Sequence, residues 1–363
     1  MNNQQTIILG GGICGLSTAY FLASSGYKST IIEKDHIGSH ASAFAFGALD
    51  YPKPTSNNLK LTDLSLLGRK LHTNLSKILP DQTGINIGYR KRPSLTLLTK
   101  KTQYENFKQI FKNDEEFQLL NKKQTLTLEP RLNNKIFGSI YNKNRSDIVP
   151  LKLLNALQKS IENQEVSIIN QKVSNLIIKN KSVDSVIVGN NEIKCDKLVI
   201  AMGPWSYKIY EWVGIKTPVS PIKGQILKLL SNSSELNYSI NWDINYVDSK
   251  PDGLIWCGTT EEKSGFDENI TENAKNKIFS ETINILPHLK DSKIVKQTAC
   301  LRPVTSDGMP IIGLSNQLNN VYFATGAGRS GITLGPAIGK IISELIIEEK
   351  TGINIENFNP DRF

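Results

Sequence analysis

Three glycines and one acid near the N-terminus have the residue types and spacing that bind a dinucleotide. Gly10, Gly12 and Gly15 follow a short apolar run in the pattern G-x-G-x-x-G, and Glu33 ends the next apolar run. Such glycines allow a tight turn, the approach of backbone N–H groups to a pyrophosphate, and close packing of helix on strand. The acid can accept hydrogen bonds from a ribose 2′-hydroxyl. We therefore predict dinucleotide binding at residues 6–33, although glycine-rich turns also simply join elements.

A second glycine-rich turn lies near the C-terminus, where residues 325–333 read TGAGRSGIT between an apolar run and a long apolar segment. A helix that begins at this turn would direct its positive end toward the electron-rich edge of a reduced cofactor. The alternative is a helix entry whose glycines only permit tight packing.

Two of the few arginines lie in this last part of the chain. Arg302 stands among apolar residues that should bury its stem, and Arg329 stands within the second glycine turn. A buried guanidinium needs an anionic or hydrogen-bonding partner, and a carboxylate held by two hydrogen bonds is the best geometric match. Each arginine therefore predicts either a substrate carboxylate or a structural ion pair with an Asp or Glu.

The elements that must position these residues follow from apolar periodicity and from glycine and proline stops. The expected helices are one from Leu16 to Gly26, then 59–79 ending at Pro80, 103–111, one opened by Pro150, 273–286 and a long C-terminal helix. The expected strands and extended pieces are 6–9, 29–32, 89–99, 125–128, 136–141, 165–169, 173–179, 182–188, 197–201, 222–230, 238–247, 254–259, 311–313 and 321–325.

This order predicts an α/β protein with a discontinuous Rossmann-like domain and a second α+β domain built on a mainly antiparallel sheet. We assign residues 1–80, 151–215 and 301–363 to the dinucleotide-binding domain, and 81–150 and 216–300 to the substrate domain. The loop 34–52, rich in small and aromatic residues, is a place where a flat ring could be held.

Composition sets the broad class. The chain has 363 residues, a net charge of +9 and 39% hydrophobic residues, which is typical of an ordinary globular protein of about two domains. The lysines form no block, so a solvated surface is favoured over a nucleic-acid footprint. Four separated cysteines and four histidines without ligand spacing predict no disulfide and no metal site, and favour the cytoplasm. We expect no membrane span, because the segment 338–347 is interrupted by charged and polar residues.

These residues together resemble the D-amino acid oxidase superfamily of flavoenzymes, and most closely its glycine oxidase branch linked to thiamine biosynthesis. The resemblance runs nearly end to end. It depends on the glycine motif with Glu33 and on LVIAMGPWS at 198–206, PIKGQ at 221–225, YVDSKPDG at 246–253, CGTTEEKSGFDENIT at 257–271, CLRPVTSDGMPIIG at 300–313 and ATGAGRSGITLGP at 324–336. The 257–271 segment and the 301–313 segment are the most specific to the branch.

The resemblance implies noncovalent FAD. The residues that it places around the cofactor come from the first glycine motif, the following acid and lysine, the small-residue loop, the middle of the chain and the second glycine turn: Gly10, Gly12, Ile13, Cys14, Gly15, Glu33, Lys34, Ala41, Ser42, Phe46, Gly47, Ala48, Val173, Gly203, Ala327, Gly328, Arg329, Ser330, Gly331, Ile332 and Thr333.

The resemblance also implies oxidation of a small amino acid such as glycine, sarcosine or a small D-amino acid. Arg302 matches the carboxylate-binding arginine, with Arg329 and Tyr246 close to the substrate. Hydride transfer from Cα to flavin N5 would give an imine, which hydrolyses to a 2-oxo acid, while O2 is reduced to H2O2. The chain departs from the family at Ser249, Lys250 and Cys300 and has a more aromatic flavin loop, so the exact substrate is not determined.

Two alternative functions remain open, and the oligomeric state is suggested by the resemblance alone. A dehydrogenase of the same superfamily would oxidise a D-amino acid or a proline-type substrate and pass electrons to a quinone or carrier. A flavin domain acting on an amino group attached to tRNA would use the positive net charge, although no basic stripe with interleaved aromatics supports it. The resemblance also suggests a homo-oligomer.

Overall fold

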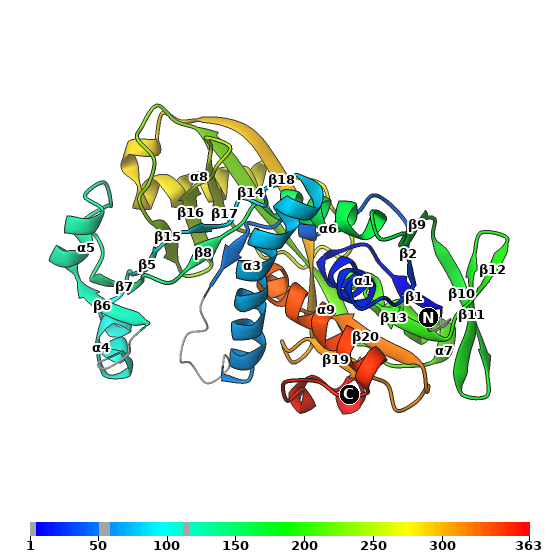
Figure 1. Ribbon diagram of the computed structural model, residues 1–363. Helices are drawn as coiled ribbons and strands as arrows, with labels where there is room; N and C mark the ends of the chain where they lie inside the picture. Colours follow the sequence, from blue (N-terminus) through cyan, green and yellow to red (C-terminus); the bar gives the residue numbers. More distant parts are fainter. Residues whose placement is uncertain (1–4, 51–58, 112–115) are drawn as a thin grey trace.

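The computed structural model describes residues 5–50, 59–111 and 116–363. The described chain forms an elongated molecule, with the sheet of the N-terminal strands at one end and a larger sheet at the other (Figure 1). This arrangement confirms the predicted α/β fold with a second, mainly antiparallel sheet. The predicted loop 34–52 extends into residues 51 and 52, which lie outside the described residues. The assignment of segments to two domains stays a prediction.

The first sheet has six strands in the order β19-β20-β13-β1-β2-β9. All neighbours are parallel except β19, which runs antiparallel to β20. Its strands come from the beginning, middle and end of the chain: β1 (Thr6–Leu9), β2 (Ser29–Glu33), β9 (Ser167–Asn170), β13 (Lys197–Ile200), β19 (Ile311–Leu314) and β20 (Val321–Thr325). The discontinuity read from the sequence is therefore present in the sheet.

The two faces of this sheet are covered differently. Ile8 packs into a core shared with the helices, whereas Ile7 and Leu9 point to the opposite face, as the alternation of a strand requires. The helices of the first core are α1 (Ile13–Ser24), α3 (Thr62–Thr83), α6 (Pro150–Glu162) and α9 (Gly331–Glu348). The opposite face is covered by α7 (Ile209–Val213) and the antiparallel sheet of β10 (Val173–Lys179), β11 (Ser182–Val188) and β12 (Asn191–Lys194).

Helix α9 is part of this core. The segment Gly328–Glu348 is long and apolar enough to cross a membrane by length and composition, and 67% of its apolar window is buried inside the protein. The helix packs closely against α1, since a Cβ on Gly335 would meet Ile13 at 2.5 Å and one on Gly339 would meet Ser17 at 2.5 Å. Its apolar character is thus accounted for by packing within the protein.

The second large sheet has eight strands in the order β18-β14-β17-β16-β15-β5-β7-β6, and only β15 and β5 run parallel. Helix α8 (Glu272–Ile285) packs on it through the third core. The strands are β5 (Ser94–Leu98), β6 (Phe117–Asn121), β7 (Gly138–Asn142), β14 (Val219–Leu230), β15 (Ser239–Trp242), β16 (Asn245–Ser249), β17 (Ile255–Gly258) and β18 (Lys293–Thr305).

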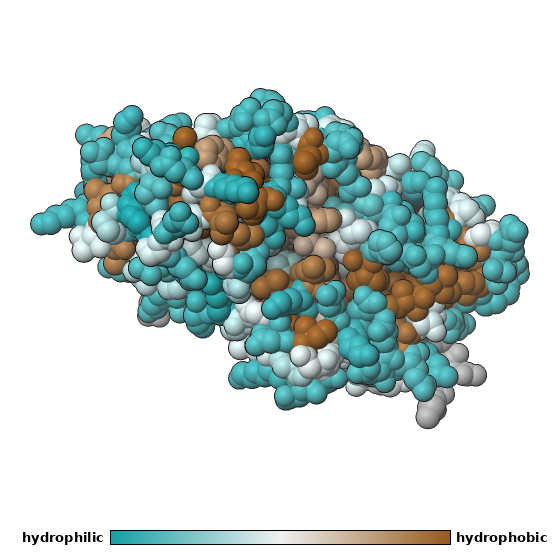
Figure 2. All heavy atoms as spheres, turned by 90° about the horizontal axis from the view of Figure 1, so that it is seen from above, coloured by the Kyte–Doolittle hydropathy of each residue, from teal (hydrophilic) through white to brown (hydrophobic). Residues whose placement is uncertain are grey.

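A small three-stranded sheet and two short α-helices complete the described strands and α-helices. The small sheet has the order β3-β8-β4, with β3 (Ala48–Leu49), β8 (Ser146–Asp147) and β4 (Arg90–Lys91), and the helices are α4 (Lys101–Ile110) and α5 (Lys122–Leu128). On the face shown in Figure 2, hydrophobic side chains form separate patches among predominantly hydrophilic ones.

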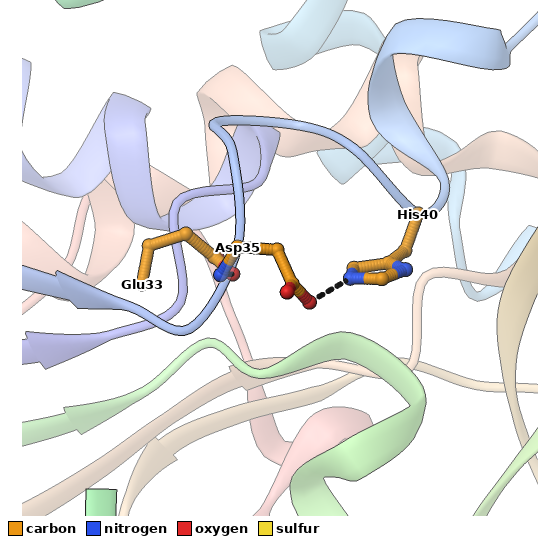
Figure 3. A group of neighbouring side chains, drawn as sticks. All are labelled: Glu33, Asp35 and His40. Carbon is orange, nitrogen blue, oxygen red and sulfur yellow. Dashed lines mark hydrogen bonds and ion pairs between the residues drawn. The ribbon is translucent and has the colours of Figure 1, made fainter. Parts of the chain in front are cut away.

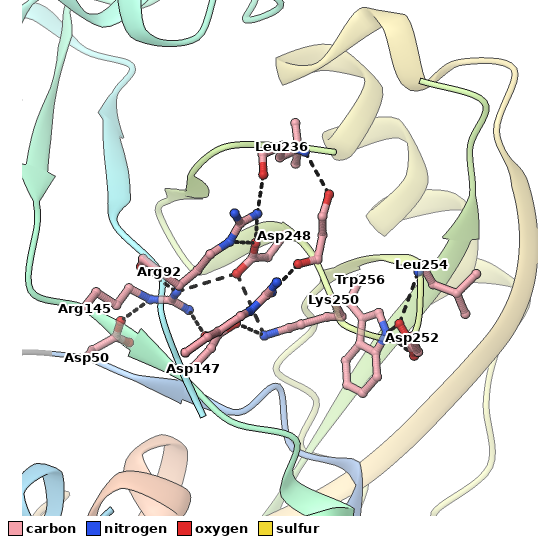
Figure 4. A network of polar contacts seen from close by, with 12 residues as sticks. Asp50, Arg92, Arg145, Asp147, Leu236, Asp248, Lys250, Asp252, Leu254 and Trp256 are labelled. Atoms are coloured by element: carbon pink, nitrogen blue, oxygen red, sulfur yellow. Dashed lines mark hydrogen bonds and ion pairs between the residues drawn. The ribbon is translucent and has the colours of Figure 1, made fainter. Parts of the chain in front are cut away.

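A buried ionic cluster joins the small sheet to the large one (Figure 4). Arg145, 1% exposed, lies within ion-pair distance of Asp147 at 2.9 Å and of Asp248 at 3.6 Å. Lys250 adds a pair to Asp147 at 2.6 Å, and Arg92 adds one to Asp248 at 2.6 Å. Burial alone would lower the pKa of Arg145, but Asp147, Asp50 and Asp248 outweigh it and raise that pKa.

One expected helix end and one expected extended segment were wrong because a local signal was misread. The helix expected to stop at Pro80 continues to Thr83 and ends at Gly84, whose φ is 73°. Proline restricts the residue before it and lacks a donor, but it does not prevent the following residues from continuing a helix. Residues 125–128, expected to be extended, belong to α5, which begins with a capping box of Asn121 and Gln124.

Two expected strands are divided. The strand expected at 89–99 is interrupted between β4 and β5 by Arg92 and Pro93. The strand expected at 238–247 is the hairpin of β15 and β16, which turns at Asp243, a residue with φ of 44°. Aspartate tolerates this left-handed conformation better than most residues, so a turn is possible without glycine. The strands β3, β6, β8, β12 and β18 were not expected.

Candidate functional site

One cavity of about 550 Å³ contains almost every residue that the sequence singled out. Of the predicted residues, only Gly15 does not line it; the other cofactor residues, together with Arg302 and Tyr246, all do. Since these residues come from both large sheets and from both glycine turns, the fold gathers segments that lie more than 300 residues apart.

The first glycine turn has the geometry that close backbone approach requires. Gly10 has φ of 108°, and a Cβ there would meet the carbonyl oxygen of Ala201 at 2.4 Å. A Cβ on Gly15 would meet the carbonyl oxygen of Gly10 at 2.0 Å, so this glycine allows α1 to approach β1. Gly15 therefore shapes the turn without lining the cavity.

The N-terminus of α1 opens into the cavity. Gly12 is its N-cap residue and supplies no side-chain cap, while the Ile13 N–H donates to Ser42 Oγ at 3.1 Å. Uncapped N–H groups and the positive end of the helix dipole suit a phosphate. The Cys14 thiol is unsuited to ionise here, because burial raises its pKa to about 12.

Glu33 ends β2 with its carboxylate at the cavity wall. Its Oε2 accepts from the Gly11 N–H at 2.7 Å, and its Oε1 accepts from the Asp35 N–H at 3.0 Å. Both oxygens are held by backbone donors and each keeps a further lone pair, which a ribose hydroxyl could use. Lys34 lies beside it, with Nζ 4.0 Å from the ring centre of Trp205.

Glu33, Asp35 and His40 also form a group in which one ligand atom of each lies within 4.8 Å of the others (Figure 3). His40 Nε2 is 2.6 Å from Asp35, and His40 Nδ1 is 2.9 Å from Glu268. Because the Glu33 oxygens are already held by backbone N–H groups and face the cavity, the group is explained by hydrogen bonding without a metal ion.

The second glycine turn forms the opposite wall of the cavity. Residues 328–330 make a single 3-10 turn, and α9 follows from Gly331. Thr333 Oγ1 donates to the carbonyl oxygen of Ala48 at 3.1 Å, which fastens the turn to the small-residue loop. On the outer side His72 Nε2 donates to the carbonyl oxygen of Ile332 at 2.7 Å. The N-terminal turns of two helices therefore line one cavity.

Arg302 is the buried cation of the site. It is 9% exposed and donates from Nη1 to the carbonyl oxygen of Thr260 at 3.0 Å and from Nη2 to Thr259 Oγ1 at 2.8 Å. Within the described ranges, no carboxylate lies within ion-pair distance of it. Gly224 makes room for the guanidinium, since a Cβ there would meet Nη1 at 2.2 Å. The glycine of PIKGQ is thus explained by this contact, which the sequence alone did not reveal.

Tyr246 and Phe46 form the apolar part of the pocket. Their ring centres are 3.9 Å apart, and both belong to a small core with Ile226 and Trp256. Burial raises the pKa of Tyr246, and Arg302 opposes that rise, so the phenol stays protonated and able to donate. Phe46 therefore shapes the pocket by packing on Tyr246.

Arg329 has a different environment from Arg302. Its side chain is 41% exposed, Nη1 donates to Glu261 at 2.6 Å, and Nη2 donates to the carbonyl oxygen of Ile244 at 2.9 Å. It lines the cavity but already has an acidic partner, as the alternative interpretation of this arginine predicted.

The chain matches, over residues 5–345, the sequence profile of the family described as FAD dependent oxidoreductase, also named DAO. It is 25% identical over 358 residues to a glycine oxidase of Bacillus licheniformis, covering 98% of this chain and 97% of that protein. It is 26% identical over 366 residues to the bifunctional protein ThiO/ThiG of Trichormus variabilis, covering 99% of this chain and 55% of that one.

Solved structures give the same likeness. A glycine oxidase from Bacillus cereus ATCC 14579 superposes with a TM-score of 0.88 at 27% identity, covering 96% of this chain and 98% of that one. An L-proline dehydrogenase from P. horikoshii shares the fold with a TM-score of 0.87 at 23% identity, covering 99% and 97% of the two chains. The predicted family resemblance is confirmed by these matches.

Proposed function

The chain belongs to the family of FAD-dependent oxidoreductases, and from this premise we propose that it oxidises a small amino acid such as glycine, sarcosine or a small D-amino acid. The observation that supports this most is Arg302, a buried guanidinium with no acidic partner among the described residues, facing the same cavity as both glycine turns. A buried cation that lacks an acidic partner in the described part of the chain is suited to bind an anionic ligand that enters the cavity from solvent.

The cofactor residues fit FAD. We propose that the uncapped N-terminus of α1 holds the pyrophosphate, that Glu33 accepts from the adenosine ribose, and that Val173 at the start of β10 lies at the adenine end. The loop 41–48 and the turn 327–333, fastened together through Thr333, would hold the flavin ring. FAD supplies the acceptor for the hydride from the substrate Cα, and O2 then takes the electrons and yields H2O2.

The chain's own residues would bind and orient the substrate. Arg302 has five N–H donors, and its two hydrogen bonds to Thr259 and Thr260 leave others for a carboxylate. Tyr246, kept protonated by burial, would donate to the same carboxylate, and its contact with Phe46 limits the room at Cα. Fixing the carboxylate orients the Cα–H bond, and orientation supplies much of the rate enhancement. Loss of a hydride from Cα of the neutral amine gives an iminium ion, which releases a proton from nitrogen to become the imine. Addition of water then releases ammonia or an amine and a 2-oxo acid.

The test is an anaerobic titration of the purified holoenzyme, following flavin absorbance while glycine, sarcosine, D-alanine and D-proline are added in turn. Bleaching by glycine or sarcosine supports the proposal, and absence of bleaching by all four contradicts it. Bleaching by D-proline alone would favour the dehydrogenase alternative. Admission of air, compared with addition of a dye acceptor, then separates an oxidase from a dehydrogenase.

We also propose a cytoplasmic enzyme that forms a homo-oligomer. All four cysteines are free thiols, as the reducing cytoplasm allows. Cell fractionation that recovered the protein outside the cytoplasm would contradict the first proposal, and a monomeric mass by light scattering would contradict the second.

A further inference from the structure

The segment 259–271 connects β17 to α8 and carries the branch-specific sequence TTEEKSGFDENIT. It forms no helix and no regular strand, apart from an isolated bridge between Lys223 and Glu262. We call these residues the strap. The strap contributes no cofactor or substrate residue to the function proposed above, so its sequence needs another explanation.

The inner side of the strap is fastened to β14 by buried polar side chains. Lys223, 1% exposed, donates from Nζ to Asp267 at 2.7 Å and to the carbonyl oxygen of Asn269 at 3.1 Å. The Gln225 side chain donates to Glu262 at 2.8 Å and accepts from the Thr271 N–H at 3.0 Å. Burial lowers the pKa of Lys223, but Asp267 and Glu262 outweigh it and raise that pKa, so the anchor stays charged.

One end of the strap holds Arg302. Its guanidinium donates to the Thr260 carbonyl oxygen and to Thr259 Oγ1, and these two threonines are the first two residues of the strap. Thr260 Oγ1 in turn donates to Glu262, the residue held by Gln225. The orientation of the Arg302 guanidinium therefore depends on the position of this end of the strap.

A more distal part of the strap, at Phe266 and Glu268, contacts the cofactor side of the cavity. The Phe266 ring lies 5.1 Å from that of Trp205 and 5.7 Å from that of Tyr207. Glu268 lies 2.9 Å from His40 Nδ1, whose other ring nitrogen meets Asp35 (Figure 3).

The residues that the strap touches there are themselves part of the cavity wall. His40 and Trp205 both line the cavity, and Lys34 stacks on Trp205 beside Glu33. The carbonyl oxygen of His40 also accepts from the Leu301 N–H at 3.0 Å, next to Arg302 in β18. The strap thus spans from the wall near Glu33 to the guanidinium of Arg302.

We infer that the strap couples cofactor retention to the carboxylate site: through Phe266 and Glu268 it holds the wall formed by His40 and Trp205, and through its first two residues it fixes the orientation of Arg302. This inference rests on the proposed function, because it takes Arg302 as the carboxylate site. Phe266 and Glu268 are positioning residues in this scheme. Coupling between two sites is reciprocal. A carboxylate bound at Arg302 therefore raises the affinity for FAD by the same factor by which bound FAD raises the affinity for the carboxylate.

The test measures FAD affinity by fluorescence titration of the apoprotein, with and without acetate as a carboxylate that cannot be oxidised. We expect acetate to tighten FAD binding at least fivefold in the natural chain. Phe266→Ala should weaken FAD binding and reduce the acetate effect to less than twofold. Since Phe266 is 40% exposed, its truncation should leave the fold intact, and Phe137→Ala, at a phenylalanine 44% exposed outside the strap, is the matched control.

The outcomes separate the two proposals. If acetate does not perturb the flavin spectrum of the natural holoenzyme at any concentration, the carboxylate site and the proposed function fail. If acetate binds and tightens FAD binding by the same factor in Phe266→Ala as in the natural chain, the proposed function stands and the strap inference is overturned. Glu268→Gln provides an independent measure of the effect of acetate on FAD affinity, because this substitution removes only the charge opposite His40.

Discussion

Two buried arginines, Arg145 and Arg302, occupy opposite electrostatic situations. Arg145 meets acidic groups from three distant parts of the chain, Asp50, Asp147 and Asp248. Among the residues that the structure describes, Arg302 meets only neutral oxygens of Thr259 and Thr260. Desolvating a guanidinium is costly in both places, but only the first is compensated by the protein itself. A paired cation holds elements together, whereas an uncompensated cation beside a cavity is available to bind an anion.

The largest effect is expected from breaking the compensated arginine. Arg145→Met leaves Asp147 and Asp248 buried at 1% and 0% exposure with fewer cations, so unfolding should need about 3–5 kcal/mol less free energy. Urea denaturation at neutral pH measures this. Lys108→Met is the control, because its pair with Glu105 is exposed and its loss should leave the midpoint unchanged. Equal midpoints for the Arg145 variant and the natural chain would show that the cluster is not stabilising.

The converse is expected at the uncompensated arginine. Arg302→Met removes the charged contact to the substrate. A loss of ~2–5 kcal/mol of binding free energy corresponds to an increase in KM by a factor between about thirty and several thousand. Its stability should change by less than about 1 kcal/mol, because an apolar side chain of similar length replaces a cation that has no acidic partner in residues 5–50, 59–111 and 116–363. Kinetics and urea denaturation of the same variant test both halves. Arg302→Lys should recover part of the binding, and an unchanged KM in Arg302→Met would rule out the carboxylate role.

The contrast between these arginines also marks what the sequence could predict. The glycine turns, the acid at the end of β2 and the apolar surroundings of Arg302 are local patterns, and each predicted its place at the cavity wall. Two of the partners of Arg145 are not local, since Asp50 and Asp248 reach it only after the small sheet and the eight-stranded sheet have formed. Arg145 therefore carried no signal in the sequence.

The same reason explains the elements that were missed or misplaced. Strand β18 is defined by its pairing with β14, which places Arg302 opposite Ile222, and no periodicity within 293–305 indicated it. The hairpin at Asp243 uses a turn without glycine. Only the short helix at 122–128 had a readable local signal, the capping box of Asn121 and Gln124.

A buried histidine that donates to a backbone carbonyl oxygen supplies a third case. His72, in α3, donates to the carbonyl oxygen of Ile332, and burial lowers its pKa to about 4. The unfolded chain takes up a proton near pH 6.5 and the folded chain does not, so stability is full above that pH and falls as pH decreases toward 4. The loss should reach about 3 kcal/mol. Urea denaturation should show that the free energy of unfolding decreases less between pH 7 and pH 4.5 for His72→Gln than for the natural chain. Identical decreases would disprove the assignment of this pH dependence to His72.

The smallest effect is expected at Arg329, which lines the cavity as Arg302 does but is paired as Arg145 is. Its side chain and that of Glu261 are each 41% exposed, so solvent screens the pair, and Arg329→Met should change stability by less than about 1 kcal/mol. For the same reason we expect its KM to rise less than about fivefold, far below the rise for Arg302→Met. Glu261→Gln frees the guanidinium and is the matched control: it should lower KM if Arg329 then attracts the carboxylate, and leave it unchanged otherwise. A KM in Arg329→Met as high as in Arg302→Met would break the comparison, because a cation with an acidic partner would then bind substrate as strongly as one without.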